Sequence, residues 1–275
     1  MKFSWKLSLT TKIGLLIIFG FFFTGVLAPW LVPYDPKGTD IGSRFSPPSS
    51  SHWLGQDKLG GDIYSKIISG AKISLMVAVT ATFISLLIGL TLGSAAGYFG
   101  GILDECLMRL VDILLAFPGL LLVFALAAFL KPSLYNVVLI FSLVGWTGFA
   151  RVSRAQVLVE KEKEFVQAIR SLGASHLRIL VCHIWPNILS PLIVQASFAM
   201  GGIIIGESSL SFLGIGVPPD HPSWGNMLFL AKQSAFQPTF VALFPGLAIM
   251  MTVLGFNFVG DGLRDAWDPK LKNSR

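Results

Sequence analysis

The chain has 275 residues, of which 53% are hydrophobic and 13% are charged, and its formal net charge is +6. Together with a mean hydropathy of +0.70, this composition is far more apolar than that of a soluble domain and predicts a protein that lies in a bilayer. The positive charge does not indicate a nucleic-acid-binding protein, because the basic residues are dispersed in short segments and form no patch interleaved with aromatic residues.

Several apolar stretches approach the ~20 residues that a helix needs to cross a hydrocarbon core. We expect six spans, at 13–33, 73–97, 108–130, 134–150, 187–213 and 239–260. The first resembles the core of a signal peptide, but it is long, precedes five further spans and lacks a convincing small-x-small cleavage site before Pro29. We interpret it as an uncleaved anchor. The sequence therefore predicts an all-α polytopic membrane protein with six transmembrane helices.

Lys and Arg in short loops set the orientation of such a chain, because they are enriched on the cytoplasmic side. If the N-terminus is cytoplasmic, most of the 21 basic residues face the cytoplasm. They are Lys2, Lys6, Lys12, Arg109, Arg151, Arg154, Lys161, Lys163, Arg170, Arg178, Arg264, Lys270, Lys272 and Arg275. Cys106 and Cys182 then also lie on the reducing side, where we expect neither to form a disulfide.

This orientation divides the chain into four regions. We expect a cytoplasmic N-terminus with the first span over 1–33 and an extracytoplasmic segment over 34–72. Helices two to six then form a core over 73–265, with a cytoplasmic loop at 155–186, and residues 266–275 form a cytoplasmic tail.

The extracytoplasmic segment is rich in Pro and Ser and leads into the run HWLGQDKLGGD, from His52 to Asp62. We interpret Asp57 and Asp62 as turn and helix caps rather than as metal ligands. The order of letters resembles the HWLGTDxLGRD element of permeases of the bacterial dipeptide, oligopeptide and nickel uptake family. Gln56 and Gly61 stand where that family has Thr and Arg.

The second span carries Gly89, Gly93 and Gly97, four residues apart, which leaves one helix face without side chains and predicts close helix packing. A short cytoplasmic loop over 104–109 is expected to follow. Pro118 lies within the expected third span, where it removes a backbone donor and can bend the helix.

The cytoplasmic loop contains a charge-rich run that predicts a helix, a sharp turn and a second helix. Phe165, Ile169 and Leu172 fall at i, i+4 and i+7, so one face of the first helix is apolar. We interpret this face as a docking surface, and the alternative is an amphipathic helix that rests on the membrane. Gly173 is expected to end the first helix in a left-handed conformation, and Ser175 to N-cap the second.

The spacing of Ala168, Gly173 and Pro186 resembles the EAA loop of bacterial ATP-binding cassette importers, in which Glu-Ala-Ala, three residues, Gly and nine residues precede Ile-x-Leu-Pro. Gln167 and Ile169 replace the first and third letters, and His183 and Trp185 replace the later Ile and Leu. The resemblance implies that this loop couples the chain to an ATPase subunit. The residues implied are Glu164, Phe165, Gln167, Ala168, Ile169, Leu172, Gly173 and Pro186.

Glu207 lies about twenty residues into the expected fifth span, where a carboxylate is costly unless it is paired or hydrated. We consider two roles for Glu207, one in the solute pathway or outer gate and one as a structural hydrogen-bonding group. Residues 206–227 resemble the ESxLSFLGLG...PxWGxM signature of the same permease family, and residues 257–269 resemble its NxxGDxLRDxxDP tail.

The sequence lacks the common motifs for nucleotide binding, catalysis and metal binding. It has no Gly-x4-Gly-Lys-Ser/Thr loop for phosphates, no His-Glu-x2-His, no Gly-x-Ser-x-Gly and no Cys/His cluster with metal-ligand spacing. We therefore expect a non-catalytic chain that holds no cofactor or metal, with ATP and Mg bound by partner ATPase subunits. An intramembrane enzyme is left as an alternative without a motif to support it.

The resemblance implies the inner-membrane permease subunit of an ATP-driven importer with the type I ABC permease fold and cytoplasmic termini. It implies as partners a second, related permease, two ATPase subunits, an extracytoplasmic solute-binding protein and membrane lipid, but no nucleic acid. Peptides are the favoured cargo, with nickel or a metal chelate as the alternative. A secondary transporter driven by an ion gradient, or a scaffold without transport activity, are competing classes that would not need the cytoplasmic helix-turn-helix.

Overall fold

The computed structural model describes residues 8–233 and 238–267. Within these ranges the regular secondary structure is helical. The described residues form no β-strand, only an isolated antiparallel β-bridge between Gln56 and Asp62. The predicted C-terminal tail from residue 268 onward, and the first seven residues with Lys2 and Lys6, lie outside the described residues.

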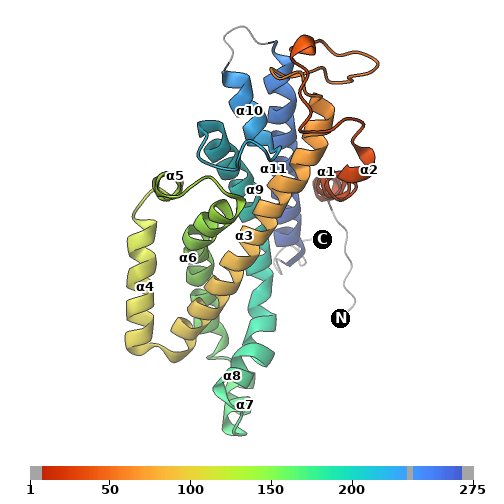
Figure 1. Cartoon of the computed structure of the whole chain (residues 1–275). Coiled ribbons are helices and arrows are strands. Elements are labelled where there is room, and N and C mark those ends of the chain that lie inside the picture. The colour runs from red at the N-terminus through yellow and green to blue at the C-terminus, as the bar shows by residue number, and fades with distance from the viewer. Residues whose placement is uncertain (1–7, 234–237, 268–275) are drawn as a thin grey trace.

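The helices follow one another in the order shown in Figure 1. They are α1 (Leu9–Val26), α2 (Ala28–Leu31), a 3-10 helix (Ile41–Ser43), α3 (Ile63–Phe99), α4 (Gly101–Leu115), α5 (Gly119–Phe129), α6 (Leu134–Glu160), α7 (Glu164–Ser171), α8 (His176–Arg178), a π-helix (Ile179–Ile184), α9 (Trp185–Leu213), α10 (Trp224–Lys232) and α11 (Phe240–Trp267).

Five stretches of the described chain are long and apolar enough to cross a membrane, namely α1, α3, α6, the continuous run His176–Leu213, and α11. Helices α4 and α5 would supply a sixth crossing if the two count as one bent span. This pattern agrees with the predicted polytopic helical fold.

The third predicted span differs from a single helix over 108–130. The chain bends by 86° between α4 and α5, and Pro118 is the N-cap of α5, so the bend expected from this proline is present. The loop predicted over 104–109 is wrong, because these residues are already helical. Gly100 and Gly101 have φ values of 66° and 61°, so they reverse the chain within two residues and α4 begins at once.

Helix α3, with 37 residues, runs diagonally from one end of the molecule to the other (Figure 1). Its glycine face lies directly against α6, as predicted. A Cβ atom on Gly89 would lie 2.7 Å from the Trp146 carbonyl oxygen, and one on Gly97 would lie 2.8 Å from the Arg154 carbonyl oxygen. Helices α3 and α6 therefore touch backbone to backbone.

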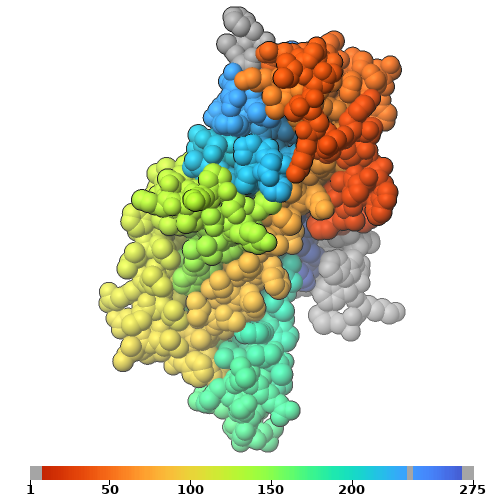
Figure 2. Space-filling view, viewed as in Figure 1, coloured from red at the N-terminus to blue at the C-terminus, as the bar shows by residue number. Residues whose placement is uncertain are grey.

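Buried apolar side chains form two main clusters. The larger joins α3, α6, α9, α10 and α11. The smaller lies where α3 and α6 meet the π-helix and the start of α9. It supports α7 and α8, which protrude from the lower end of the molecule in Figure 2.

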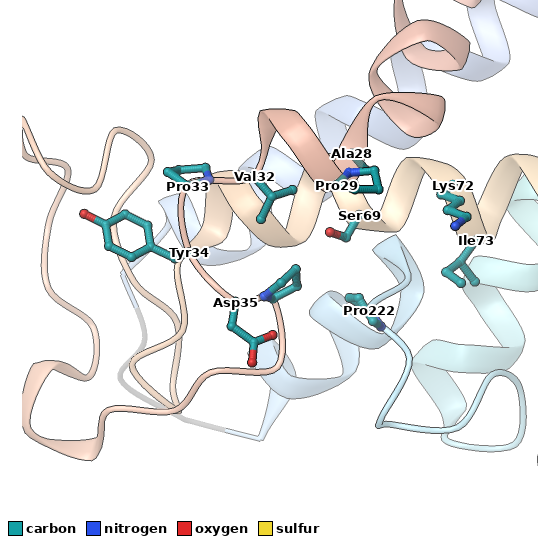
Figure 3. Close-up of a pocket in the computed structure, with 11 residues that line it drawn as sticks. Ala28, Pro29, Val32, Pro33, Tyr34, Asp35, Ser69, Lys72, Ile73 and Pro222 are labelled. Carbon is teal, nitrogen blue, oxygen red and sulfur yellow. The ribbon is translucent and has the colours of Figure 1, made fainter.

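The opposite end carries the segment 32–62 and α10 (Figure 1). A cavity of about 440 Å³ opens there, between α2, α3 and the loop before α10 (Figure 3). The projection formed by α7 and α8 thus stands at one end of α3. The segment 32–62, named the outer segment after its expected extracytoplasmic position, stands at the other end.

Candidate coupling loop and buried carboxylate

The turn between α7 and α8 has the geometry predicted for it. Gly173 adopts φ of 82° directly after α7. Its N–H donates to the Arg170 carbonyl at 3.0 Å, and the Ala174 N–H donates to the Ile169 carbonyl at 3.4 Å. These two bonds are the Schellman pattern that closes a helix C-terminus. The Ser175 hydroxyl accepts from the Arg178 N–H at 3.4 Å, which confirms the predicted N-cap of α8.

The apolar side chains of α7 do not all lie on one face that packs against a partner, as the sequence pattern predicted. Val166 is the buried anchor, with 2% exposure. Ile169 is half-buried against the same cluster, whereas Phe165 and Leu172 are 40% and 86% exposed. The sequence pattern did not reveal Val166, because the helical spacing of Phe165, Ile169 and Leu172 defines a neighbouring face of the helix. The exposed apolar side chains remain available to a partner.

The other predicted coupling residues also lie on the surface of this protruding loop. Glu164, Gln167, Ala168 and Gly173 are exposed on α7 and its turn, and Pro186 is exposed at the start of α9. The structure thus brings the first four together and places Pro186 beyond the π-helix, at the base of the same projection.

Three polar contacts fasten this loop to the end of α3. The Lys161 ammonium donates to the Gly97 carbonyl at 2.8 Å. The Tyr98 hydroxyl lies 3.0 Å from His176 Nδ1, and the Trp185 indole N–H donates to the Ser94 hydroxyl at 3.0 Å. Because His176 and Trp185 lie on either side of the π-helix, α3 contacts both α8 and the start of α9.

The second helix of the loop does not end before α9. The run His176–Leu213 is continuous, with the π-helix Ile179–Ile184 inserted between α8 and α9. The predicted fifth span over 187–213 is therefore the C-terminal part of a longer helical run. A π-helix has a wider turn that often marks functional sites in helices.

Glu207, near the far end of this continuous helix, is fully buried with 0% exposure. The Ser211 hydroxyl donates to its carboxylate at 2.9 Å, and the Ser74 hydroxyl on α3 donates at 3.1 Å. Ser208 is also buried beside it, and its hydroxyl has no hydrogen-bond partner within the described residues. The carboxylate therefore joins α9 to α3 through hydroxyl groups, and a role in the solute pathway or gate stays a prediction.

A family model described as binding-protein-dependent transport system inner membrane component matches residues 89–273. The chain belongs to this family. The permease is 42% identical over 261 residues to the dipeptide transport system permease protein DppC of Alkalihalophilus pseudofirmus, which covers 95% of this chain and 86% of the relative. It is 44% identical over 247 residues to the glutathione transport system permease protein GsiD of Pectobacterium atrosepticum, covering 90% and 82%.

The fold of the permease is similar to that of a solved ABC importer. An inward-facing structure of the MetNI methionine ABC transporter matches with a TM-score of 0.60 and 18% identity, covering 74% of this chain and 97% of that chain. The chain is thus a multi-pass inner-membrane permease subunit of an ABC importer. This result favours the importer over the secondary transporter driven by an ion gradient and over the scaffold.

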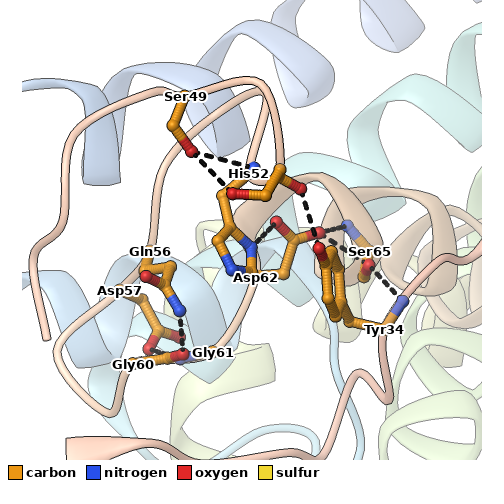
Figure 4. Close-up of polar contacts among 10 residues, drawn as sticks. Tyr34, Ser49, His52, Gln56, Asp57, Gly60, Gly61, Asp62 and Ser65 are labelled. Carbon is orange, nitrogen blue, oxygen red and sulfur yellow. Dashed lines mark hydrogen bonds and ion pairs between the residues drawn. The ribbon is translucent and has the colours of Figure 1, made fainter. Parts of the chain in front are cut away.

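The outer segment of the permease is held by buried polar contacts (Figure 4). Asp62 caps α3, accepting from the Ser65 N–H at 2.8 Å, and lies 2.9 Å from His52 Nδ1. Asp57 accepts from the Gly61 N–H at 3.0 Å and pairs with the Lys66 ammonium at 2.5 Å. The predicted capping roles of both acids are confirmed, whereas the Lys66 pair was not foreseen.

Within the described residues the permease contains no group of three or more His, Cys, Asp or Glu side chains arranged to hold a metal ion. Cys106 and Cys182 are both free and exposed.

Proposed function

We propose that this permease subunit carries short peptides into the cell. The support is the shared identity with relatives described as dipeptide and glutathione permeases and with a di/tripeptide permease of Pseudomonas aeruginosa at 40% identity. Nickel or a metal chelate is the second candidate cargo, and no observation on this chain favours it. The permease itself performs no catalysis and holds no cofactor, since ATP and Mg are bound by partner subunits.

The proposed assembly contains a second, related permease, two ATPase subunits and an extracytoplasmic solute-binding protein. In it both termini and the α7–α8 loop face the cytoplasm. The exposed side chains of Phe165 and Leu172 support this arrangement, because apolar groups on a projection with a charged surround are typical of a docking surface. The coupling set is Glu164, Phe165, Gln167, Ala168, Ile169, Leu172, Gly173 and Pro186.

The observation that carries the mechanism is the continuous helix from His176 to Leu213. It joins the exposed loop directly to the region of Glu207, where Ser74 of α3 is bound. When the ATPase subunits close, they move α7, and the helix together with α3 transmits this motion to the outer side. This is rigid-body alternating access between the permease subunits.

Co-purification and uptake test the proposal together. The permease, expressed together with the proposed partner subunits, should retain the ATPase subunits during purification. Vesicles that contain the complex and the binding protein should accumulate a labelled dipeptide only with ATP, and unlabelled dipeptides should compete. Saturable nickel uptake that peptides do not affect would select the metal alternative, and a permease that transports without any ATPase subunit would overturn the proposal.

A further inference from the structure

The cavity of about 440 Å³ at the outer end of the molecule has walls of two kinds (Figure 3). One wall is apolar and is formed by the prolines and valine that follow α1. The polar groups come from α3 and from the segment after α2. The lining residues are Ala28, Pro29, Val32, Pro33, Tyr34, Asp35, Pro36, Ser69, Lys72, Ile73 and Pro222.

Ser69 and Lys72 present two donors on one side of the cavity. They are three residues apart on α3 and therefore lie on the same helix face. Lys72 is exposed, and neither side chain has an ion pair or hydrogen bond to another described residue. Gly25 of α1 packs on the backbone of α3 here, since a Cβ atom on Gly25 would lie 3.2 Å from the Lys72 backbone nitrogen. This close crossing fixes where the lysine side chain leaves α3.

Asp35 supplies the opposite charge across the cavity, as Figure 3 shows. Its carboxylate accepts the Lys37 N–H at 2.9 Å, which holds the side chain in a local turn and leaves its remaining lone pairs open. A single anion would satisfy Lys72 but would be repelled by Asp35. The cavity is therefore suited to a group that carries both charges.

Asp35 and Lys72 lie beside different turns of α3. The Tyr34 N–H donates to the Ser65 hydroxyl at 3.4 Å, which places the neighbourhood of Asp35 beside the first turn of α3. Lys72 follows Ser65 by seven residues, so it lies about 10 Å further along the helix. Trp30, 77% exposed on α2, stands at the same end of the molecule. Exposed tryptophan is typical of the boundary between lipid and water.

We propose that this cavity binds the headgroup of a phospholipid that carries phosphoethanolamine. The phosphate accepts hydrogen bonds from the Ser69 hydroxyl and the Lys72 ammonium, and the lipid ammonium donates to Asp35. In such a lipid the phosphate lies between the acyl chains and the amine, which matches the deeper position of Lys72. Lys72 is exposed on α3, and the phosphate supplies its ammonium with a charge-assisted hydrogen bond.

Other headgroups fit this set of residues less well. Phosphatidylglycerol has no cation for Asp35, and the quaternary amine of phosphatidylcholine has no N–H to donate. A zwitterionic peptide has the right charges, but it lacks the acyl chains that would cover the apolar wall around Val32. The inference does not depend on which solute the permease carries.

Native mass spectrometry of the purified permease complex tests the site. The complex is equilibrated in turn with phosphatidylethanolamine, phosphatidylglycerol and phosphatidylcholine that have identical acyl chains. We expect preferential retention of phosphatidylethanolamine on the permease. We expect Lys72→Gln to reduce that retention about tenfold, the effect of losing one charge-assisted hydrogen bond. Asp35→Asn should abolish the preference over phosphatidylglycerol.

Lys131→Gln is the matched control, because Lys131 is an exposed lysine in the turn between α5 and α6, away from the cavity. It should bind phosphatidylethanolamine as the unmodified permease does. If Lys72→Gln does not yield a folded complex, Ser69→Ala is a second variant that tests the site. It should weaken retention of phosphatidylethanolamine severalfold. Equal retention of the three lipids, unchanged binding in Lys72→Gln, or displacement of the lipid by a dipeptide would each overturn the assignment.

Discussion

Glu207 is the residue whose environment most constrains its role. Its carboxylate is fully buried and accepts from Ser74 and Ser211. Removing such an acceptor leaves two buried hydroxyl donors without this partner, at a cost of about 1–3 kcal/mol each. We therefore expect Glu207→Ala to lower the melting temperature of the complex and to reduce uptake. Glu207→Gln, which keeps one carbonyl acceptor, should be milder.

The matched control for Glu207 is Ser209→Ala on the exposed face of the same helix, where only a bond to the Ile205 carbonyl is lost. This variant should melt and transport as the unmodified permease does. If Glu207→Ala and Glu207→Gln were both indistinguishable from Ser209→Ala in thermal stability, uptake and ATPase coupling, Glu207 would have neither the pathway role nor the structural one.

Gly93 gives a second prediction, since it is the point where α3 touches α6 most closely. A Cβ atom there would overlap the Ala150 backbone, so Gly93→Ala should force the helices apart and cost about 1–3 kcal/mol of stability. Gly202→Ala meets nothing within 4 Å and should gain up to about 1 kcal/mol from better helix propensity. Thermal unfolding of the two variants in the same detergent should shift in opposite directions, and equal shifts would contradict the packing.

Residues whose conformation is set locally could be predicted from the sequence, and those that depend on a distant partner could not. The turn at Gly173 and the cap at Asp62 follow from residue type and spacing alone. The burial of Val166 depends on the π-helix residues Ile179 and Leu180, which share its apolar cluster. The Lys66 pair with Asp57 depends on a chain reversal that periodicity does not reveal.

At the scale of elements, the outer segment is predicted to depend on the buried pair of Lys66 and Asp57. Their side chains are 8% and 6% exposed. Breaking a buried pair by removing one partner costs about 3–5 kcal/mol, because the remaining charge has no partner. We expect Lys66→Met to loosen residues 32–62 from α3 and to expose them to protease added to the outer side of membrane vesicles.

Lys58→Met is the control for this pair, since among the described residues the Lys58 ammonium hydrogen-bonds only to the Gln233 amide oxygen, at 3.4 Å. It should remain as resistant to protease as the unmodified chain. Cleavage of both variants at the same rate, or of neither, would show that the buried pair does not hold the outer segment.

Hydropathy predicted the existence of the spans better than their shape. Pro118 indicated a bend, but its size depends on how α5 packs against α6, and the helical start of α4 depends on two left-handed glycines. Ion pairs fix α4 in place, with Asp104 on Arg154 and Asp112 on Arg151, both at 2.5 Å. These contacts join residues that are about fifty and forty positions apart, so no local sequence pattern predicts them.

In the mechanism proposed for the whole molecule, the α7–α8 loop transmits ATPase closure through the continuous helix and α3. The turn at Gly173, with φ of 82°, sets the direction of α7. A β-branched residue there costs roughly 1–2 kcal/mol in the left-handed conformation and reorients the exposed face, whereas asparagine tolerates it. Ala168→Arg would instead block close approach of a partner without changing the turn.

The most direct measurement is uptake of a labelled dipeptide, driven by ATP, in vesicles that contain the reconstituted complex. We expect Gly173→Val and Ala168→Arg to insert and express normally, to bind the ATPase subunits weakly and to lose uptake, while Gly173→Asn retains most of it. If Gly173→Val and Ala168→Arg transported as well as Gly173→Asn, the loop would not be the coupling element and the proposed mechanism would be wrong.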